Sequence, residues 1–498
     1  FINCLHLTFI SEELRSNKEI KEVFLNNSSL NKILKSNFNG VKFTYRNSFS
    51  KYLKKTLLRP IVDIFNNLII SYYSLVSKET ARVFKLKKNK KIILIDTFIL
   101  ENSLNKSEFI DRYYNNILNY TESRINDEIL FVPSIYGKYN SRILNDINEK
   151  SNYNFLYKCD FLSTYDFCKV FYLMFSQKFN NNKIFFNEFD LTDLIRSEFH
   201  KNKFNTSSFE GLLNYFFIKK LKKNNFKISL FINWFENQPI DKGLIKGMKD
   251  YFPRIKTKGY QGFVAAYNYS FHLIPTDYEN DLGLIPDEII VTGDGLIPIV
   301  KKFDKNLVVK TGPALRYYSY ENLPFKMNSI NNTILIILPI GMSNAVLLIK
   351  KIIRVFDLMD KIDYKIFIKP HPIDEKNIRK IIFHFNKYNF EIVTSKFEKI
   401  IHKVNLCIGN SSSALIESLL HSVPVIVISD EKNIIQNPIP ETVDKLYWNL
   451  CYSNNEILNA IEQLLNLSKK DLLDMKEEIE KKYFIKPTLK NVLKLLKN

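Results

Sequence analysis

The residues best suited to chemistry form the run Gly-Asn-Ser-Ser-Ser at 409–413, which follows an apolar segment at 404–408. A helix is predicted over 413–421, so unpaired backbone N–H groups and serine hydroxyls gather at its first turn, where a phosphate is favoured. The predicted phosphate ligands are Gly409, Asn410, Ser411, Ser412 and Ser413. The alternative is that Asn410 or Ser413 only caps the helix.

Glu417 follows Ser413 by one helical turn, so both side chains are expected on the same face of this helix. A carboxylate in that position can accept hydrogen bonds from the hydroxyls of a ribose. The alternative is a surface glutamate that is stabilised by the positive end of the helix dipole.

A second candidate site is Lys369-Pro370-His371-Pro372, which directly follows a strand predicted at 364–368. Ligands of open α/β sheets bind beyond the carboxyl ends of the strands, so Lys369 and His371 are expected to face the same region as the serine run. An imidazole there can donate a hydrogen bond to a phosphate and stabilise the charge of a departing nucleotide. The alternative is a structural histidine.

Glu236 is the first candidate for a general base, because it follows a strand predicted at 227–234 and lies among aromatic residues. Partial desolvation there is expected to raise the pKa of a carboxyl group towards the range that suits a base. The alternative is that Glu236 or Asn237 caps the next helix. Asp294 lies in the Gly-Asp-Gly turn after a strand predicted at 288–292, where the next helix is expected to begin.

Three further loops supply candidate ligands. Tyr260 and Gln261, which lie between two glycines, offer hydrogen bonds to a sugar, with a plain turn as the alternative. Arg316 can clamp a diphosphate or an acidic sugar with two hydrogen bonds, or it can pair with an acid across two domains. Gly341 and Ser343, where a helix is predicted to begin, are further donors towards a bound ligand.

These residues are positioned by two series of short apolar runs that alternate with helical segments, a pattern typical of parallel sheets buried on both faces. The first series has predicted strands at 91–98, 129–133, 227–234, 288–292 and 306–311. The second has predicted strands at 333–338, 364–368, 391–393, 404–408 and 424–429, with helices predicted at 345–358, at 375–385, near 397 and at 413–421. A polar stretch at 321–332 separates them, so we predict a hinge near residue 325, an N-terminal acceptor-binding α/β domain at 1–325 and a C-terminal nucleotide-binding domain at 326–498.

The composition restricts the class of protein. The 498 residues, of which 45% are hydrophobic and 14% aromatic, indicate a folded protein, and the net charge of +20 suits an anionic partner. Five scattered cysteines predict neither a disulfide framework nor a zinc site, and no apolar run is long enough to predict a transmembrane helix. We therefore expect a cytoplasmic protein, with the reservation that the chain begins at Phe1 rather than Met. Walker A and G-x-G-x-x-G sequences are missing, which disfavours ATP hydrolysis and NAD binding.

The segments KPHP at 369–372 and GNSSSALIES at 409–418, with VPVIVI at 423–428, carry a resemblance. Together they resemble the C-terminal half of bacterial surface-polysaccharide glycosyltransferases of the GT-B fold, in particular the group with HP and SS/T motifs. That group includes sialyltransferases, capsule Kdo-transferases and CDP-glycerol glycerophosphotransferases. The serine run is also similar to a segment of non-hydrolysing UDP-GlcNAc 2-epimerases. The resemblance implies two Rossmann-like domains facing a central cleft, with His371 and Ser411–Ser413 on the nucleotide phosphates and Glu417 on the ribose. The sialyltransferase group carries a paired-acid-plus-Gly motif as its base, and Asp294-Gly295 matches only part of it, so the resemblance leaves the base open between Glu236 and Asp294.

The resemblance also predicts a function. We expect a metal-independent glycosyltransferase without a cofactor, which moves a sugar from a nucleotide-activated donor, preferably CMP-linked, to a glycan or lipid-linked acceptor of surface polysaccharide such as capsule or lipopolysaccharide. Such an enzyme would lie in the cytoplasm or on the anionic inner face of the membrane. One alternative is a sugar-nucleotide epimerase of the same fold. Another is a basic nucleic-acid-binding protein, which is disfavoured because the basic residues are dispersed and form no recognised module.

Overall fold

The computed structural model describes residues 2–25, 27–45, 58–77, 90–100, 111–115, 117–121, 124–136, 144, 147, 149, 153–180, 182–268, 270–318, 333–359, 364–371, 374–375, 377–378, 390–429 and 436–497. The chain forms two compact units, which we describe separately. Unit 1 comprises Phe1–Val83, Lys138–Asn145 and Tyr157–Asn224, and unit 2 comprises Phe84–Gly137, Asp146–Leu156 and Asn225–Asn498. The predicted hinge near residue 325 lies outside the described residues.

Unit 2 contains a first six-stranded sheet in which all neighbouring strands are parallel. Its strands are β3 (Ile92–Leu100), β4 (Glu128–Tyr136), β7 (Ile228–Trp234), β8 (Thr257–Gln261), β9 (Glu288–Val291) and β10 (Val309–Thr311), in the order β10-β9-β8-β7-β3-β4. Five of the six overlap the predicted strands. The strand that the sequence analysis missed is β8, whose residues Thr-Lys-Gly-Tyr-Gln are all buried and had been interpreted as a loop.

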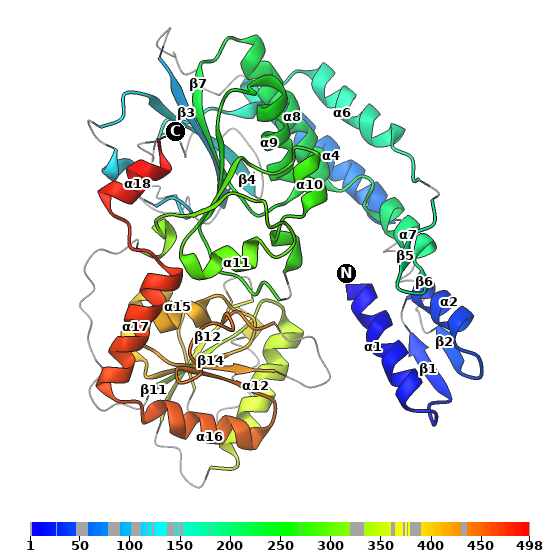
Figure 1. The fold of residues 1–498 in the computed structure, drawn as a ribbon, viewed down its shortest axis with the longest axis vertical. Helices are drawn as coiled ribbons and strands as arrows, with labels where there is room; N and C mark the ends of the chain where they lie inside the picture. Colours follow the sequence, from blue (N-terminus) through cyan, green and yellow to red (C-terminus); the bar gives the residue numbers. More distant parts are fainter. Residues whose placement is uncertain are drawn as a thin grey trace. The chain divides into compact units, whose positions relative to one another are not determined.

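A second six-stranded parallel sheet lies in the C-terminal part of unit 2. It comprises β11 (Thr333–Ile337), β12 (Lys365–Lys369), β13 (Glu391–Ile392), β14 (Leu406–Gly409), β15 (Val425–Ile428) and β16 (Trp448–Cys451), in the order β13-β12-β11-β14-β15-β16. Counted from β11, this order is 3-2-1-4-5-6, the strand order of the Rossmann fold. Helices α12 (Met342–Phe356), α15 (Ala414–Leu420) and α16 (Asn454–Leu465) accompany this sheet (Figure 1). Apolar side chains of α12 and α16 form a common core with β11, β12, β14 and β15.

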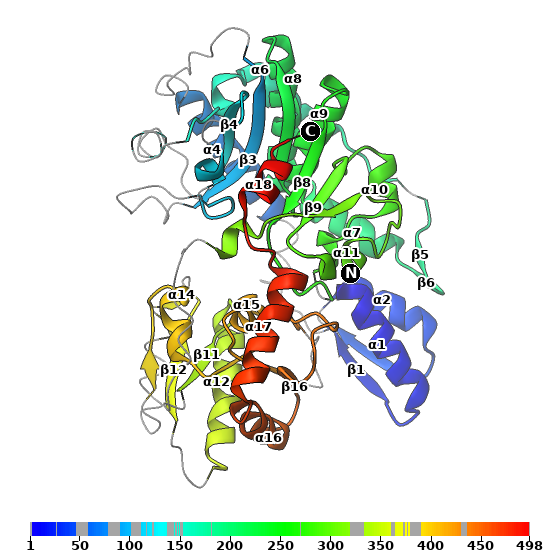
Figure 2. The same cartoon turned by 60° about the vertical axis from the view of Figure 1, so that its left-hand side comes forward.

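The expected α/β class with two parallel, Rossmann-like sheets is therefore confirmed. The predicted helices at 345–358, near 397 and at 413–421 correspond to α12, α14 (Phe397–Ile400) and α15. The helix predicted over 375–385 lies mostly outside the described residues. Figure 2 shows β12 and β11 beside α14 and α12.

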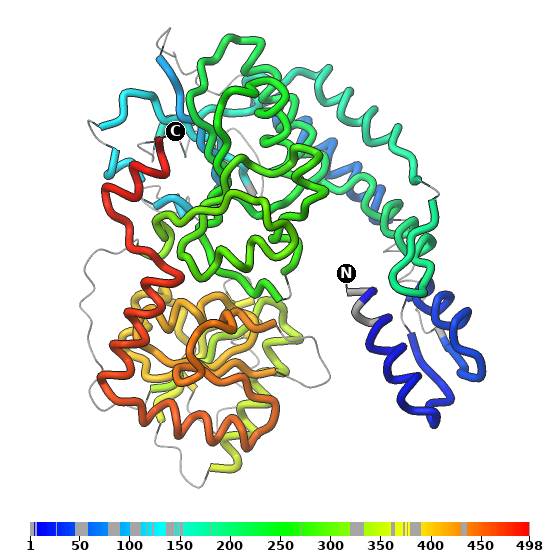
Figure 3. The backbone as a smooth tube through the Cα atoms, viewed as in Figure 1, coloured from blue at the N-terminus to red at the C-terminus, as the bar shows by residue number. Residues whose placement is uncertain are grey.

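The end of the chain returns to the first sheet. Helix α17 (Lys469–Tyr483) leads to Ile485, whose backbone N–H donates to Thr292 O at 2.8 Å and whose carbonyl accepts from Ala314 N at 2.8 Å. Gly293 permits this approach, because a Cβ atom there would lie 2.0 Å from Lys482 O. The tube in Figure 3 traces α17 and then α18 (Leu489–Leu495), which packs beside η4 (Ile117–Tyr120).

Unit 1 is mainly helical. Its helices are α1 (Ile2–Ser16), α2 (Ser28–Asn37), α4 (Arg59–Val76), α6 (Thr164–Ser176), α7 (Thr192–Asn202), α8 (Thr206–Lys223) and the short η5 (Lys158–Asp160), and its strand pairs are β1 (Glu22–Leu25) with β2 (Lys42–Tyr45) and β5 (Phe185–Phe186) with β6 (Phe189–Asp190). Both α4 and α6 pack against α8.

The remaining helices of unit 2 lie between the strands of the two sheets or follow them. They are α9 (Pro239–Tyr251), η6 (Phe271–Leu273), α10 (Asp277–Asp281), η7 (Asp294–Leu296), α11 (Ile297–Val300), η8 (Leu315–Tyr317) and η10 (Ile401–Lys403). None of the described helices is both long enough and apolar enough to span a membrane.

Candidate functional site

The strand orders locate one switch point in each sheet, where the chain reverses its direction of winding and ligands of open α/β sheets bind. In the second sheet this point lies between β11 and β14, which are followed by Gly341 and by the serine run. In the first sheet it lies between β3 and β7, and β7 is followed directly by Glu236. The predicted phosphate ligands and the first predicted base thus both lie at topological switch points.

Beside the switch point of the second sheet, Asp374 holds two loops together. Its carboxylate accepts the Gly341 N–H at 2.8 Å, and its own backbone N–H donates to His371 O at 2.9 Å. Gly341 has φ of 94°, a backbone conformation that favours glycine. Its N–H is therefore engaged within the protein and is not a free donor for a ligand, contrary to the prediction. Ser343, on the first turn of α12, is exposed.

The His371 side chain is half-buried. Burial lowers the pKa of its imidazole, as does the positive charge of Arg112, while Asp374 raises it. Because the pKa lies below its ordinary value of 6.5, the ring is neutral at pH 7 and offers one N–H donor. Lys369, at the end of β12, donates to Ser395 O at 2.6 Å, and burial lowers the pKa of its amine.

The serine run forms a tight turn after β14. Asn410 Oδ1 accepts the Ser411 N–H at 2.7 Å, and Ser412 Oγ accepts the Ala414 N–H at 3.3 Å. The N-cap of α15 is Ser413, whose side chain makes no capping hydrogen bond, and Asn410 bonds only its neighbour before the helix, so neither of the two proposed caps uses its side chain in that way. Among the described residues, the exposed hydroxyl of Ser413 has no protein partner, which leaves it available to a ligand. Gly409 is required by packing, because a Cβ atom would lie 2.9 Å from Ile337 O.

The carboxyl group of Glu417 is influenced by charged residues that follow strands of both parallel sheets of unit 2. Burial raises the pKa of its carboxyl group and Glu398 adds to this increase, whereas Arg316 and Arg112 lower it, and the resulting pKa is about 7. Both arginines belong to segments that follow strands of the first sheet. Glu417 on α15 therefore lies within electrostatic range of two cations that come from elsewhere in unit 2.

Arg112 was missed by the sequence analysis, because no motif surrounds it. Asp111 fixes the turn that carries it, since its carboxylate accepts from Thr97 Oγ1 at 2.5 Å and from the backbone N–H of Tyr113 at 2.7 Å. The Arg112 side chain reaches solvent, but partial desolvation lowers the pKa of its guanidinium, and the like charge of Arg316 lowers it further. The only sequence signal is that this turn follows β3, a strand that borders a switch point.

Two buried polar side chains hold the segment of Arg316 in place. The Tyr260 hydroxyl donates to Pro313 O at 2.6 Å and accepts the Leu315 N–H at 3.1 Å. The Asn115 amide donates to Leu315 O at 3.4 Å, which joins the Arg112 turn to the Arg316 segment. The proximity of the two arginines is thus built into the backbone contacts of the first sheet.

This role corrects the interpretation of Tyr260 and Gln261 as sugar ligands. Both lie within β8 and are completely buried, and Gln261 donates to Leu273 O at 3.0 Å. Gly259 serves close packing, because a Cβ atom would lie 2.6 Å from Pro286 and 2.9 Å from Phe235. The two polar side chains therefore support the site from inside the protein.

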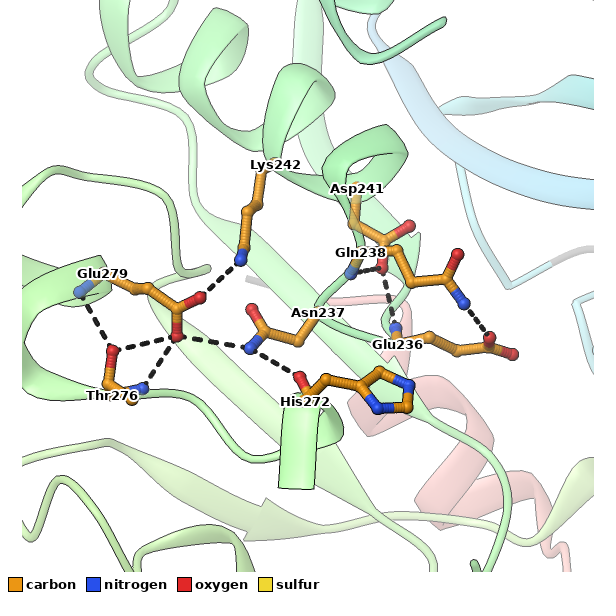
Figure 4. Close-up of polar contacts among 8 residues, drawn as sticks. All are labelled: Glu236, Asn237, Gln238, Asp241, Lys242, His272, Thr276 and Glu279. Carbon is orange, nitrogen blue, oxygen red and sulfur yellow. Dashed lines mark hydrogen bonds and ion pairs between the residues drawn. The ribbon is translucent and has the colours of Figure 1, made fainter. Parts of the chain in front are cut away.

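Glu236 is held by a network of hydrogen bonds (Figure 4). Its two carboxylate oxygens accept from Trp234 Nε1 and from Gln238 Nε2, both at 2.8 Å. Its backbone N–H donates to Asp241 Oδ2 at 2.8 Å, so the same residue that caps α9 also fixes this turn. The residues that cap α9 are therefore Gln238 and Asp241, and not Glu236 or Asn237. The half-buried carboxylate of Glu236 is oriented by two side-chain donors.

Next to this turn, Asn237 adopts a left-handed backbone conformation with φ of 55°. Its amide donates to His272 O at 2.9 Å and to Glu279 Oε2 at 3.3 Å. Burial lowers the pKa of the His272 imidazole, while the negative charge of Glu236 raises it. Figure 4 shows the His272 ring on the same side of the turn as Glu236.

Tyr113 connects the two groups of charges. Burial raises the pKa of its phenol, Arg112 and Arg316 lower it, and Glu236 raises it. Its ring also lies 4.3 Å, centroid to centroid, from that of Trp234. Glu236, the two arginines, Glu417 and His371 thus form one series of titratable groups, linked by their electrostatic effects on one another or on Tyr113.

Asp294 lies outside this series. It is exposed at the start of η7. Its negative charge raises the pKa values of Lys482 and Tyr483 of α17. Of the two candidate bases, only Glu236 is shown to act electrostatically on Tyr113 together with the two arginines. Among the described residues, no group of His, Cys, Asp and Glu side chains is arranged to hold a metal ion.

The chemistry available at this site follows from its charges. Two guanidinium groups and a neutral imidazole can bind and stabilise an anion, while a carboxylate oriented by two donors can accept a proton. Because both functions belong to one series of neighbouring groups, the site suits a reaction in which a proton is removed on one side and an anionic group departs on the other.

No family profile and no curated protein sequence matches the chain. Similar solved structures include TarM, with 13% identity, a TM-score of 0.47 and coverage of 82% of this chain and 98% of that one. The lipopolysaccharide outer core galactosyltransferase WaaB has 10% identity, a TM-score of 0.45 and coverage of 82% and 99%. The UDP-GlcNAc 2-epimerase from Neisseria meningitidis bound to UDP-GlcNAc has 13% identity, a TM-score of 0.44 and coverage of 81% and 98%. At these identities and TM-scores, the likenesses assign neither a substrate nor a reaction to the chain.

Proposed function

We propose that the chain is a glycosyltransferase that uses a nucleotide-activated sugar. The observation that supports this most directly is the convergence of Arg112, Arg316, His371 and Glu417 beside the switch point of a Rossmann-like sheet. The two guanidinium groups and the imidazole would bind the phosphates of the donor. The free hydroxyl of Ser413 would add a further donor, and Glu417 would accept hydrogen bonds from the ribose.

The reaction would proceed by displacement at the anomeric carbon. Glu236 would accept the proton of the acceptor hydroxyl as the new bond between that oxygen and the anomeric carbon forms. The bond from the anomeric carbon to the phosphate oxygen would break, and its electron pair would remain on the phosphate. The arginines and His371 would stabilise that charge, which is the electrostatic contribution expected of such a site.

The finer assignments rest on the resemblance of the HP and serine motifs. They favour a cytidine nucleotide as the leaving group and a glycan or lipid-linked acceptor of surface polysaccharide. An acceptor of that kind would place the enzyme at the inner face of the cytoplasmic membrane, where anionic lipids attract basic proteins.

The test is a thermal-shift panel with CMP, CDP, UDP, GDP and ADP on the wild type and on His371→Ala. At a ligand concentration of about 100 times Kd, binding adds about 2.7 kcal/mol to the free energy of unfolding, and we expect this for at least one nucleotide. His371→Ala should lose most of the shift, whereas His200→Ala, at an exposed position of α7, should keep it. A wild type that no nucleotide stabilises would refute the proposal.

A product assay separates transfer from epimerisation. With the nucleotide sugar found in the panel, we expect release of free nucleotide only when an acceptor is added. A sugar nucleotide that is interconverted without an acceptor would identify an epimerase instead.

A further inference from the structure

Helix α4 of unit 1 has its polar and apolar faces reversed relative to an ordinary surface helix. Its buried residues are polar: Asn67 is fully buried and donates to Phe204 O at 2.9 Å, and Ser71 Oγ donates to Asn67 O at 2.7 Å. An amphipathic helix of a globular protein normally buries its apolar stripe instead. The helix is therefore anchored to unit 1 by a side that contains these two buried polar residues together with the partly buried Ile64, Ile70 and Leu75.

The opposite face of α4 is apolar and open to solvent. Its large side chains are between 37% and 62% exposed, namely Ile61, Val62, Phe65, Leu68, Ile69, Tyr72, Tyr73 and Val76. Members of this set recur at intervals of three and four residues, so they form a stripe along the helix. We call this set the α4 face. Contiguous exposed apolar surface of this kind marks an interaction site.

The charge of unit 1 identifies the class of partner. Unit 1 contains 26 Lys and Arg against 13 Asp and Glu, so it holds +13 of the total net charge of +20. Within α4 the charged residues are only Arg59 and Asp63, and the sequence on either side of it is rich in lysine. A second copy of the chain would bring a like charge to the α4 face, which opposes self-association. A partner surface that is both anionic and apolar would complement the positive charge of unit 1 and the apolar α4 face.

We propose that the α4 face docks unit 1 onto an anionic lipid surface, with α4 lying in the plane of the interface. The helix has 18 residues and a length of about 27 Å, and its aromatic and aliphatic side chains would enter the boundary between headgroups and acyl chains. The net positive charge of unit 1 would bind the anionic headgroups. This inference goes beyond the proposed transfer reaction, because lipid binding is measured without donor or acceptor.

The first test is co-sedimentation of the full chain with vesicles of phosphatidylcholine, with and without a third of phosphatidylglycerol. We expect binding to the anionic vesicles that weakens as salt is added, and a loss of at least about tenfold in partition for the double variant Phe65→Glu and Tyr72→Glu. The matched control is Tyr278→Glu, at a residue of α10 in unit 2 that is 69% exposed, and it should bind like the wild type. Equal binding by the α4 variant and the wild type would overturn the proposal.

The second test does not depend on a loss of binding. The two native tryptophans, Trp234 and Trp448, are at most 1% exposed, so their emission should not change on lipid binding, and the difference spectrum between Phe65→Trp and the wild type reports on the added tryptophan. We expect solvent-exposed emission without vesicles and a shift to shorter wavelength when anionic vesicles are added. Emission that is already shifted without vesicles would show that another part of the protein, or a second copy, covers the α4 face, and the proposal would fail.

Discussion

Arg316 lies within electrostatic range of Glu417, although the two residues belong to segments that follow strands of different sheets of unit 2. Arg316 follows the last strand of the first sheet, whereas Glu417 lies on the helix after the serine run of the second. Of the two cations that lower the pKa of the Glu417 carboxyl group, Arg316 has the larger effect. The candidate site therefore contains a cation from the first sheet within electrostatic range of the helix that follows the serine run.

We predict that Arg316→Gln and Arg112→Gln each weaken the binding of the nucleotide by about 10- to 100-fold. A hydrogen bond to a charged group contributes roughly 1.5–3 kcal/mol, and each 1.4 kcal/mol is a factor of ten in Kd. Isothermal titration calorimetry with the nucleotide from the thermal-shift panel measures the loss. Arg254→Gln, at an exposed arginine of the same unit, is the matched control and should bind normally. Unchanged affinity in both site variants would contradict the assignment of the arginines.

Glu417 should make the stability of the protein depend on pH near neutrality. The folded protein holds this proton up to a pKa of about 7, whereas the unfolded chain releases it near 4.5. Between these values the folded state binds more protons, so the contribution of Glu417 to the free energy of unfolding is lost as the pH rises. Relative to Glu417→Gln, the wild type should lose up to about 3 kcal/mol between pH 4.5 and 7.

Urea unfolding of the wild type and of Glu417→Gln at several pH values gives this difference directly, because the other titrating groups cancel. The difference between the two free energies of unfolding should change through this interval and be constant above it. A difference that is the same at pH 5 and pH 8 would show that the carboxyl group titrates normally.

The sequence predicted those parts of the site that are encoded locally. The serine run and His371 follow buried parallel strands, and such strands are recognisable as continuous apolar runs. Arg112 could not be found in this way, because its approach to Glu417 depends on how strands distant in sequence are ordered. Tyr260 was interpreted as a ligand because its glycine neighbours indicate a turn, yet these glycines allow a buried strand to pack closely against Phe235 and Pro286. Burial of a polar side chain depends on contacts that the local sequence does not contain.

We predict that Glu236→Gln lowers kcat for sugar transfer by about 100- to 10,000-fold, the contribution expected of a general base. The nucleotide Kd should be unchanged, because Glu236 lies on the acceptor side of the arginines in the proposed reaction. Asp294→Asn is the matched control and should retain activity, since Asp294 faces Lys482 and Tyr483. The assignment of the base would reverse if Asp294→Asn were inactive and Glu236→Gln active.

Lys258 anchors the end of the chain to the first sheet. Its side chain is only 3% exposed, and its amine donates to the carbonyl oxygens of Lys494 and Leu495 at 3.0 Å and to that of Lys497. Since these carbonyls belong to the last turn of α18 or follow it, the amine provides hydrogen bonds to acceptors that have no partner within the helix. We predict that Lys258→Met lowers the free energy of unfolding by roughly 2 kcal/mol, because it leaves buried acceptors unpaired. Faster amide exchange confined to α18 would locate the effect.

The same lysine should produce a second dependence on pH. Burial lowers the pKa of its amine from 10.5 to about 8, so between these values the unfolded chain binds the proton that the folded protein has released. The free energy of unfolding of the wild type should therefore rise with pH in this interval, and Lys258→Met should lack that rise. Lys256→Met, which removes a partly exposed ion pair with Glu288, is the matched control and should keep it. If Lys258→Met followed the wild type from pH 8 to 10.5, Lys258 would titrate in the folded protein as it does in the unfolded chain.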